Sequence, residues 1–75
     1  MKVRREMYVI SLIGKHRMLF AKEVTMTLAK ERASKELHSK PDPYCGGFDY
    51  AEIYNQEDKS TIQKNGIGCT WVKAG

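Results

Sequence analysis

The sequence predicts an α+β domain with the element order β-β-α-β-β-β, in which one helix covers one face of an antiparallel sheet of four to five strands. One segment has apolar residues at helical spacing, whereas several shorter segments alternate between apolar and polar residues, as strands do. Turn-forming residues separate these segments. A chain of 75 residues forms one domain with a small core, so we expect a single domain over residues 1–75.

The stretch from residue 18 to residue 38 organises the prediction. Residues 18–25 are expected to form a strand that leads almost directly into a helix over residues 27–38. Thr27 is the preferred N-cap, with Thr25 as the alternative, because a threonine hydroxyl can accept a hydrogen bond from a free N–H of the first turn. The helix face that packs on the sheet is indicated by apolar residues at three- and four-residue steps, namely Met26, Ala29, Ala33 and Leu37.

The segment before this stretch supplies a partner strand. Residues 6–13 are rich in β-branched and aromatic side chains, and residues 14–17 form a turn signal. We therefore expect residues 6–25 to form a hairpin, preceded by a flexible basic tail at residues 1–5. Both faces of the first strand are largely apolar, which favours a central strand or a surface that meets a partner.

The segment after the helix supplies the rest of the sheet. Pro41 and Pro43 end the helix and begin a loop over residues 41–47. Asn65-Gly66 is the strongest hairpin signal in the chain and predicts a tight two-residue turn. The remaining strands are expected at residues 48–54, 60–64 and 67–72.

Charge is distributed unevenly along the chain, whose formal net charge is +4. Residues 1–40 contain ten Lys or Arg against four Glu, and residues 41–75 contain three Lys against five acids, so the halves carry +6 and −2. This layout is compatible with binding to nucleic acid or to an acidic protein face. The alternative is a solvated surface that keeps a small protein soluble.

Residues with catalytic or metal-binding chemistry are few. The spacing of His16, His38, Cys45 and Cys69 matches no zinc-ligand pattern, and no glycine-rich stretch precedes a helix as a phosphate loop does. We expect no enzyme activity, no metal and no cofactor, and two free thiols in a reducing cytoplasm. No apolar run approaches the roughly 20 residues that span a bilayer, and we expect no membrane partner and no signal peptide.

Three sets of residues are candidates for contact with a partner, and the first two are alternatives. A basic surface is expected from the first turn and the outer face of the helix, at Lys15, Arg17, Lys30 and Lys35. An acidic rim, which could imitate phosphates, is expected at Asp49, Glu52, Glu57 and Asp58. Exposed aromatic anchors are expected at Tyr44 and Tyr54.

The segment Met18-Leu19-Phe20-Ala21-Lys22-Glu23-Val24-Thr25-Met26 resembles part of the Dmd antitoxin of T-even phages. In that family a Met/Phe strand also continues through a Lys-Glu-aliphatic-Thr-Met sequence towards a helix, and the spacing from Glu6 to Gly14 is similar too. More broadly, the chain resembles the small phage proteins that combine a short sheet with a helix, many of which bind and block a host complex. The resemblance implies a protein that acts by binding.

We therefore expect a non-enzymatic inhibitor, encoded by a phage, that blocks a host protein or nucleoprotein complex, as an anti-CRISPR or an antitoxin does. Its location would be the cytoplasm of the host cell, and it would be a monomer or a homodimer. The alternative is a small RNA- or DNA-binding regulator that uses the basic N-terminal half.

Overall fold

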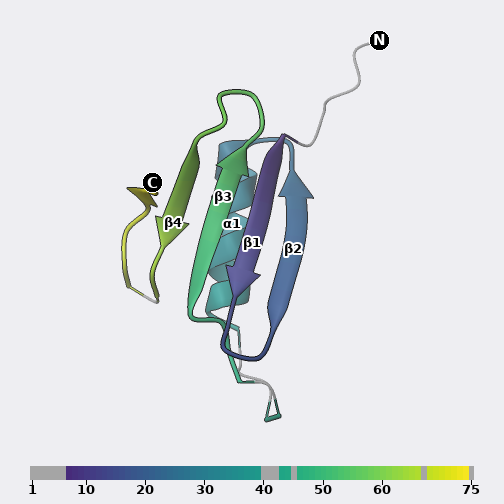
Figure 1. The fold of residues 1–75 in the computed structure, drawn as a ribbon, viewed down its shortest axis with the longest axis vertical. Helices are drawn as coiled ribbons and strands as arrows, with labels where there is room; N and C mark the ends of the chain where they lie inside the picture. The colour runs from purple at the N-terminus through teal and green to yellow at the C-terminus, as the bar shows by residue number, and fades with distance from the viewer. Residues whose placement is uncertain (1–6, 40–42, 45, 67, 75) are drawn as a thin grey trace.

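The computed structural model describes residues 7–39, 43–44, 46–66 and 68–74. The strands are β1 (Tyr8–Ile13), β2 (Met18–Glu23), β3 (Tyr50–Asn55), β4 (Thr61–Lys64) and β5 (Val72–Lys73), and the helix is α1 (Met26–Leu37). The five strands form one antiparallel sheet in the order β2-β1-β3-β4-β5, and α1 packs along one face of it (Figure 1). The predicted fold class and element order are confirmed.

Strand β1 is the middle one of β2, β1 and β3, the three neighbouring strands that contact α1. It pairs with β2 on one side and with β3 on the other, so that Ile10 faces Ala21 and Ile53 in the two neighbouring strands. The predicted first hairpin is confirmed, and Gly14 N donates to Arg17 O across its turn at 2.8 Å. The apolar residues of β1 divide between the two faces of the sheet, because Ile10 and Leu12 lie in the core and Val9 and Ile13 point to the opposite face.

The core lies between α1 and the strands β1 and β3. Its large, fully buried side chains are Ile10, Leu12 and Ile53, and Ala51 completes the sheet side. The helix contributes Ala29, Ala33 and Leu37, the face that apolar spacing predicts, while Met26 is partly buried beside them. The alanines bring the helix backbone close to the sheet but bury little apolar area, so we expect modest stability.

The helix begins one residue earlier than predicted. Thr25, not Thr27, is the N-cap: it has extended backbone angles and its hydroxyl accepts from Leu28 N. The carbonyl of Thr25 also accepts from Ala29 N at 3.0 Å. The helix therefore starts at Met26, whose side chain packs against the core, and β2 ends at Glu23, two residues before the expected end.

The last hairpin differs from the prediction. A two-residue turn at Asn65-Gly66 would place Lys64 opposite residue 67, but β4 and β5 pair Ile62 with Lys73. Residues 65–71 therefore connect the strands, and β5 is much shorter than the expected strand at residues 67–72, of which residue 67 lies outside the described residues. This longer connection brings Trp71 against the core, so tertiary packing overrides the local turn preference.

Strand β3 begins two residues later than expected, and the two residues before it, Phe48 and Asp49, still contact the rest of the fold. Phe48 packs against the core, and Asp49 N donates to Ile13 O at 2.8 Å. Strand β4 begins one residue later than predicted, at Thr61. The predicted tail at residues 1–5 and most of residues 40–45 lie outside the described residues.

Candidate functional site

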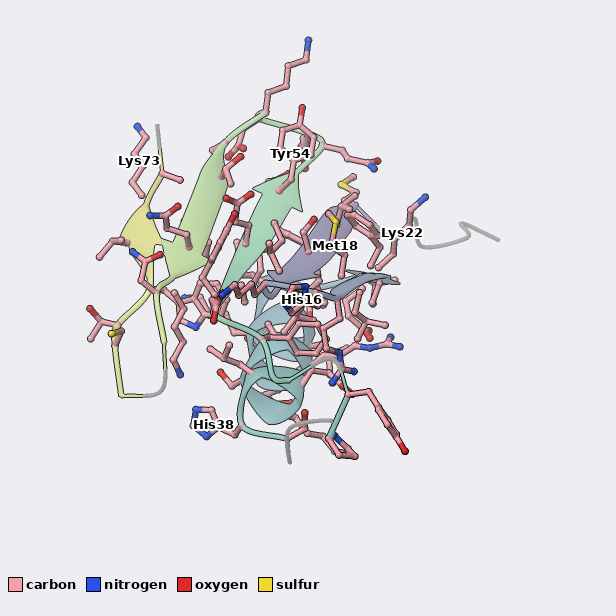
Figure 2. The ribbon with its side chains drawn as sticks, turned by 60° about the horizontal axis from the view of Figure 1, so that its bottom comes forward. His16, Met18, Lys22, His38, Tyr54 and Lys73 are labelled. Atoms are coloured by element: carbon pink, nitrogen blue, oxygen red, sulfur yellow. The ribbon has the colours of Figure 1, made fainter. Side chains whose placement is uncertain are left out.

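The face of the sheet opposite α1 has no helix over it in the part of the chain that the structure describes. Figure 2 shows this face, with Met18, Lys22 and Tyr54 on the side of the sheet away from the helix and His38 on the helix side. Successive side chains of a strand point to opposite faces, so strand register defines the members of each face. We call this surface the uncovered face.

The uncovered face consists of rows of side chains that cross the strands. One row is Met18, Ile13 and Tyr50, from β2, β1 and β3. A second row places Phe20 beside Ser11, which lies beside Glu52. The complete set is Val9, Ser11, Ile13, Met18, Phe20, Lys22, Tyr50, Glu52, Tyr54, Thr61, Gln63 and Val72.

Large apolar side chains are concentrated on this face. Phe20 is 61% exposed and Met18 is 59% exposed, although both belong to a regular strand. Tyr54 and Val72 are exposed on the same face, so it holds four of the six exposed large hydrophobic residues among those described. Exposed apolar side chains that gather on one face in this way are typical of a binding site in a soluble protein.

The apolar character is confined to one part of the face. Strands β2, β1 and β3 place aromatic or aliphatic side chains there, whereas β4 contributes Thr61 and Gln63. Lys22 and Glu52 are the charged residues among the described members of the face, and their formal charges cancel. The face is therefore apolar and nearly neutral, in contrast to the net charge of the whole chain.

The structure does not gather the predicted acidic rim into one patch. Asp49 precedes β3 and lies beside the end of β1, whereas Glu57 and Asp58 lie in the turn at the other end of β3. Glu52 lies between these ends, on the uncovered face. The four acids are thus spread along the length of the strand.

Asp58 accepts hydrogen bonds within the turn between β3 and β4. The Ser60 hydroxyl and the Ser60 N–H both donate to the Asp58 carboxylate, and these hydrogen bonds lower the pKa of Asp58 below its ordinary value. Lys59, between them, has a positive φ of 60°, which a tight turn requires. In the same turn, Asn55 Oδ1 accepts from Glu57 N at 2.9 Å. Substitution of Asp58 would therefore change the turn as well as the surface charge.

The predicted basic residues occupy two elements. Lys15 is exposed in the turn between β1 and β2, and Lys35 is exposed on the last turn of α1, while Lys30 is half-buried. The half-buried Arg17 side chain contacts residues that follow the helix. Its guanidinium carbon lies 4.2 Å from the centroid of the Phe48 ring, and its Nη1 donates to Gly46 O at 3.4 Å.

The predicted aromatic anchors lie apart. Tyr44 is 93% exposed in the loop after the helix, and Tyr54 lies on the uncovered face. Sequence reasoning did not select Met18, Phe20 or Val72 as site residues. The signal for the first two was the alternation within residues 18–23, which places Met18, Phe20 and Lys22 on the face opposite Leu19 and Ala21.

Groups suited to metal or nucleophilic chemistry do not come together among the described residues. No three His, Cys, Asp or Glu side chains there could share a metal ion. His16 is exposed in the first turn, His38 caps the end of α1, and Cys69 is an exposed free thiol between β4 and β5. Cys45 lies outside the described residues. Within the same residues, no helix is both long and apolar enough to cross a membrane.

The fold and its surface define a small α+β domain with an uncovered, largely apolar sheet face. Comparison of the chain with family models, with curated proteins and with solved structures found no match. The residues of this chain and their arrangement are therefore the basis for assigning a function.

Proposed function

We propose that this protein is a non-enzymatic inhibitor that binds a host protein or nucleoprotein complex through the uncovered face. The observation that carries the proposal is the exposure of Met18, Phe20 and Tyr54 on one side of a sheet whose other side is covered by α1. Burial of exposed apolar side chains is the main favourable contribution to most protein association. The phage origin and the blocking action rest on the resemblance to small phage proteins.

The side chains of the face suit a small binding protein. Specific interfaces remove about 800 Å² of surface from each partner, and aromatic residues near the centre commonly contribute most of the binding energy. Phe20 and Tyr54 lie on β2 and β3, on either side of β1, and offer such anchors. The exposed lysines at the first turn and on α1 lie outside the face, where charge would orient the approach of a partner rather than hold it.

A second candidate function is binding of single-stranded nucleic acid. It is favoured by three aromatic side chains on one open sheet face, Phe20, Tyr50 and Tyr54, which could stack with bases. The charges of the face favour the protein partner instead. Nucleic-acid binding requires several cationic contacts to phosphates, whereas Lys22 is accompanied on this face by the negative Glu52.

The proposal is tested by affinity capture from nuclease-treated lysates of bacterial hosts with matched variants. Phe20→Ser removes an anchor of the uncovered face, and Leu28→Ser removes another exposed large apolar side chain, from α1. We expect Phe20→Ser to reduce recovery of the specific partner by about tenfold or more, and Leu28→Ser to leave it unchanged. Equal recovery with both variants would exclude the uncovered face as the binding site.

Charge variants distinguish the two candidate functions and the two predicted charged surfaces. Lys15→Glu combined with Lys35→Glu reverses exposed basic residues without disturbing the Arg17 contacts, and Glu57→Lys reverses an exposed acid without removing Asp58. For a protein partner held by the uncovered face, we expect modest changes that weaken as salt is added. A complex that is lost on nuclease treatment, and whose affinity falls steeply with salt, would identify nucleic acid as the partner.

A further inference from the structure

The two edges of the sheet are unequal. Strand β5 forms one edge and contains two residues, Val72–Lys73, whereas β2 forms the other edge and contains six residues. Proteins commonly protect an edge strand by shortening it, bending it with a bulge, or placing proline or charged side chains in it. Strand β2 is not short, bulged or interrupted by proline, because its register with β1 is continuous from Met18 to Glu23 and its sequence is MLFAKE; its charged residues, Lys22 and Glu23, lie together at one end of the strand.

The register shows which backbone groups of β2 point outward. Gly14 and Arg17 form a hydrogen-bonded pair at the turn, and bonded and non-bonded pairs alternate along an antiparallel ladder. The pairs that contain Leu19, Ala21 and Glu23 are therefore the bonded ones. It follows that Met18, Phe20 and Lys22 direct their N–H and C=O groups away from β1, towards the open edge, while their side chains lie on the uncovered face.

We propose that β2 pairs antiparallel with β2 of a second copy of this chain, with Phe20 opposite Phe20 of that copy. A two-fold axis perpendicular to the sheet would pass between the two phenylalanines. In this register Met18 lies opposite Lys22 of the second copy. Each outward-directed residue then pairs with another outward-directed residue, which gives about six inter-chain hydrogen bonds.

The side chains of β2 are complementary to themselves in this register. The two Phe20 rings meet across the axis, and aromatic cross-strand pairs are favourable. Lys22 faces Met18 of the second copy rather than another lysine. One step beyond the strand, Arg17 lies opposite Glu23 of the second copy, which adds unlike charges on the helix side of the sheet to the contacts that Arg17 makes with Phe48 and Glu23 makes with Arg32 within each chain. Shifting the register by two residues in either direction loses the Phe20 pair and the Arg17 match.

The rest of the fold leaves space for this pairing. Helix α1 lies across β1 and β3, and Figure 1 shows β2 at the margin of the sheet beyond it. The ion pair between Arg32 and Glu23, at 2.7 Å, joins α1 to β2 on the helix side of the sheet. The assembly would be one continuous ten-stranded sheet, with both uncovered faces on the same side.

The first test is the mass of the protein in solution, measured by light scattering across concentrations that reach the millimolar range. We expect the mass to rise from monomer to dimer. Lys22→Pro removes an outward N–H but no bond to β1, so it should abolish the dimer and preserve the circular dichroism spectrum. Val72→Ser, at the other edge of the uncovered face, should still dimerise. A wild-type protein that stays monomeric throughout would overturn the proposal.

The second test examines register by cysteine cross-linking, in a background with Cys45 and Cys69 changed to serine. In the proposed register the Cα atoms of residue 20 are about 5.5 Å apart, within disulfide range, so Phe20→Cys should form a covalent dimer on mild oxidation. Met18→Cys places its thiols roughly four residues, or about 14 Å, apart along the strands and should not cross-link. Equal cross-linking of both variants, or of neither, would contradict this register and hence the proposal.

Discussion

Substitution of Ala33 by glutamate tests the packing of α1 on the sheet. Ala33 is fully buried near the middle of the helix, against a core whose large members are Ile10, Leu12 and Ile53. Ala33→Glu adds side-chain volume and an ionisable group at this contact. Ala33→Gln adds nearly the same volume without a charge, and so provides the matched control.

The expected loss of stability has two parts. Overpacking a tight contact costs about 1–3 kcal/mol, and this part is common to both variants. Glutamate must in addition remain protonated to stay buried, and moving its pKa from about 4.3 to about 7 corresponds to about 3.7 kcal/mol near pH 7. The sum for Ala33→Glu, about 5–7 kcal/mol, is comparable to the whole stability of a small domain, which is about 5–15 kcal/mol. We therefore expect Ala33→Glu to be largely unfolded near neutral pH.

The assay is urea unfolding of the parent and both variants near pH 7 and near pH 4. Burial raises the pKa of the introduced carboxyl in the folded state, so its penalty should be absent below the unfolded pKa and should grow as pH rises. The two variants should therefore converge near pH 4 and diverge near pH 7. A constant difference between them, or a Glu variant as stable as the parent, would show that position 33 reaches water.

Three further predictions concern other parts of the fold. A Cβ atom on Gly14 would overlap the carbonyl oxygen of Gly47, so Gly14→Ala should destabilise by about 1–3 kcal/mol in urea unfolding; without that contact the substitution would stabilise slightly. Ile53→Ala should cost about 2–5 kcal/mol by the same measurement, and Ile53→Val about 0.5–1.5 kcal/mol, because the side chain is fully buried. The lowered pKa of Asp58 means that its hydrogen bonds from Ser60 stabilise the fold above the ordinary pKa of 3.8 and lose this effect as pH falls through the folded value. Asp58→Ala should therefore melt below the parent at neutral pH, and acid titration that leaves this gap unchanged would contradict the assignment.

The sequence predicted the elements whose pattern is strong. Alternation in residues 8–13 and 18–23, and helical spacing of Ala29, Ala33 and Leu37, each match an element of the structure. These patterns are informative because each element must bury one face. Element ends were less predictable, as the N-cap shows: Thr25 and Thr27 have the same hydroxyl, and the choice between them depends on backbone angles set by the preceding strand.

The last hairpin and the functional surface were harder to predict, for different reasons. Asn65-Gly66 is a strong local signal, but the packing of Trp71 beside the core outweighs it. The charge pattern of the sequence predicts a binding surface at the turns and on the helix. In the structure, the most exposed apolar side chains of the sheet lie on β2. A Met or Phe in a strand is usually a core residue, and it is the position of α1 in the structure that shows Met18 and Phe20 on the other side of the sheet.

The binding function and the proposed dimer both involve β2, but they use different groups of it. A partner on the uncovered face would contact the Phe20 side chain, whereas a second copy would bond to the backbone of Met18, Phe20 and Lys22. Lys22→Pro removes one edge donor together with the Lys22 side chain of the uncovered face, so its matched control is Lys22→Ala, which loses the same side chain but keeps the donor. Lys22→Pro should abolish dimerisation and should capture the partner as well as Lys22→Ala does. Phe20→Ser should weaken both. Loss of partner capture in Lys22→Pro would mean that the partner binds the dimer, because one protomer would then present too little of the face to hold it.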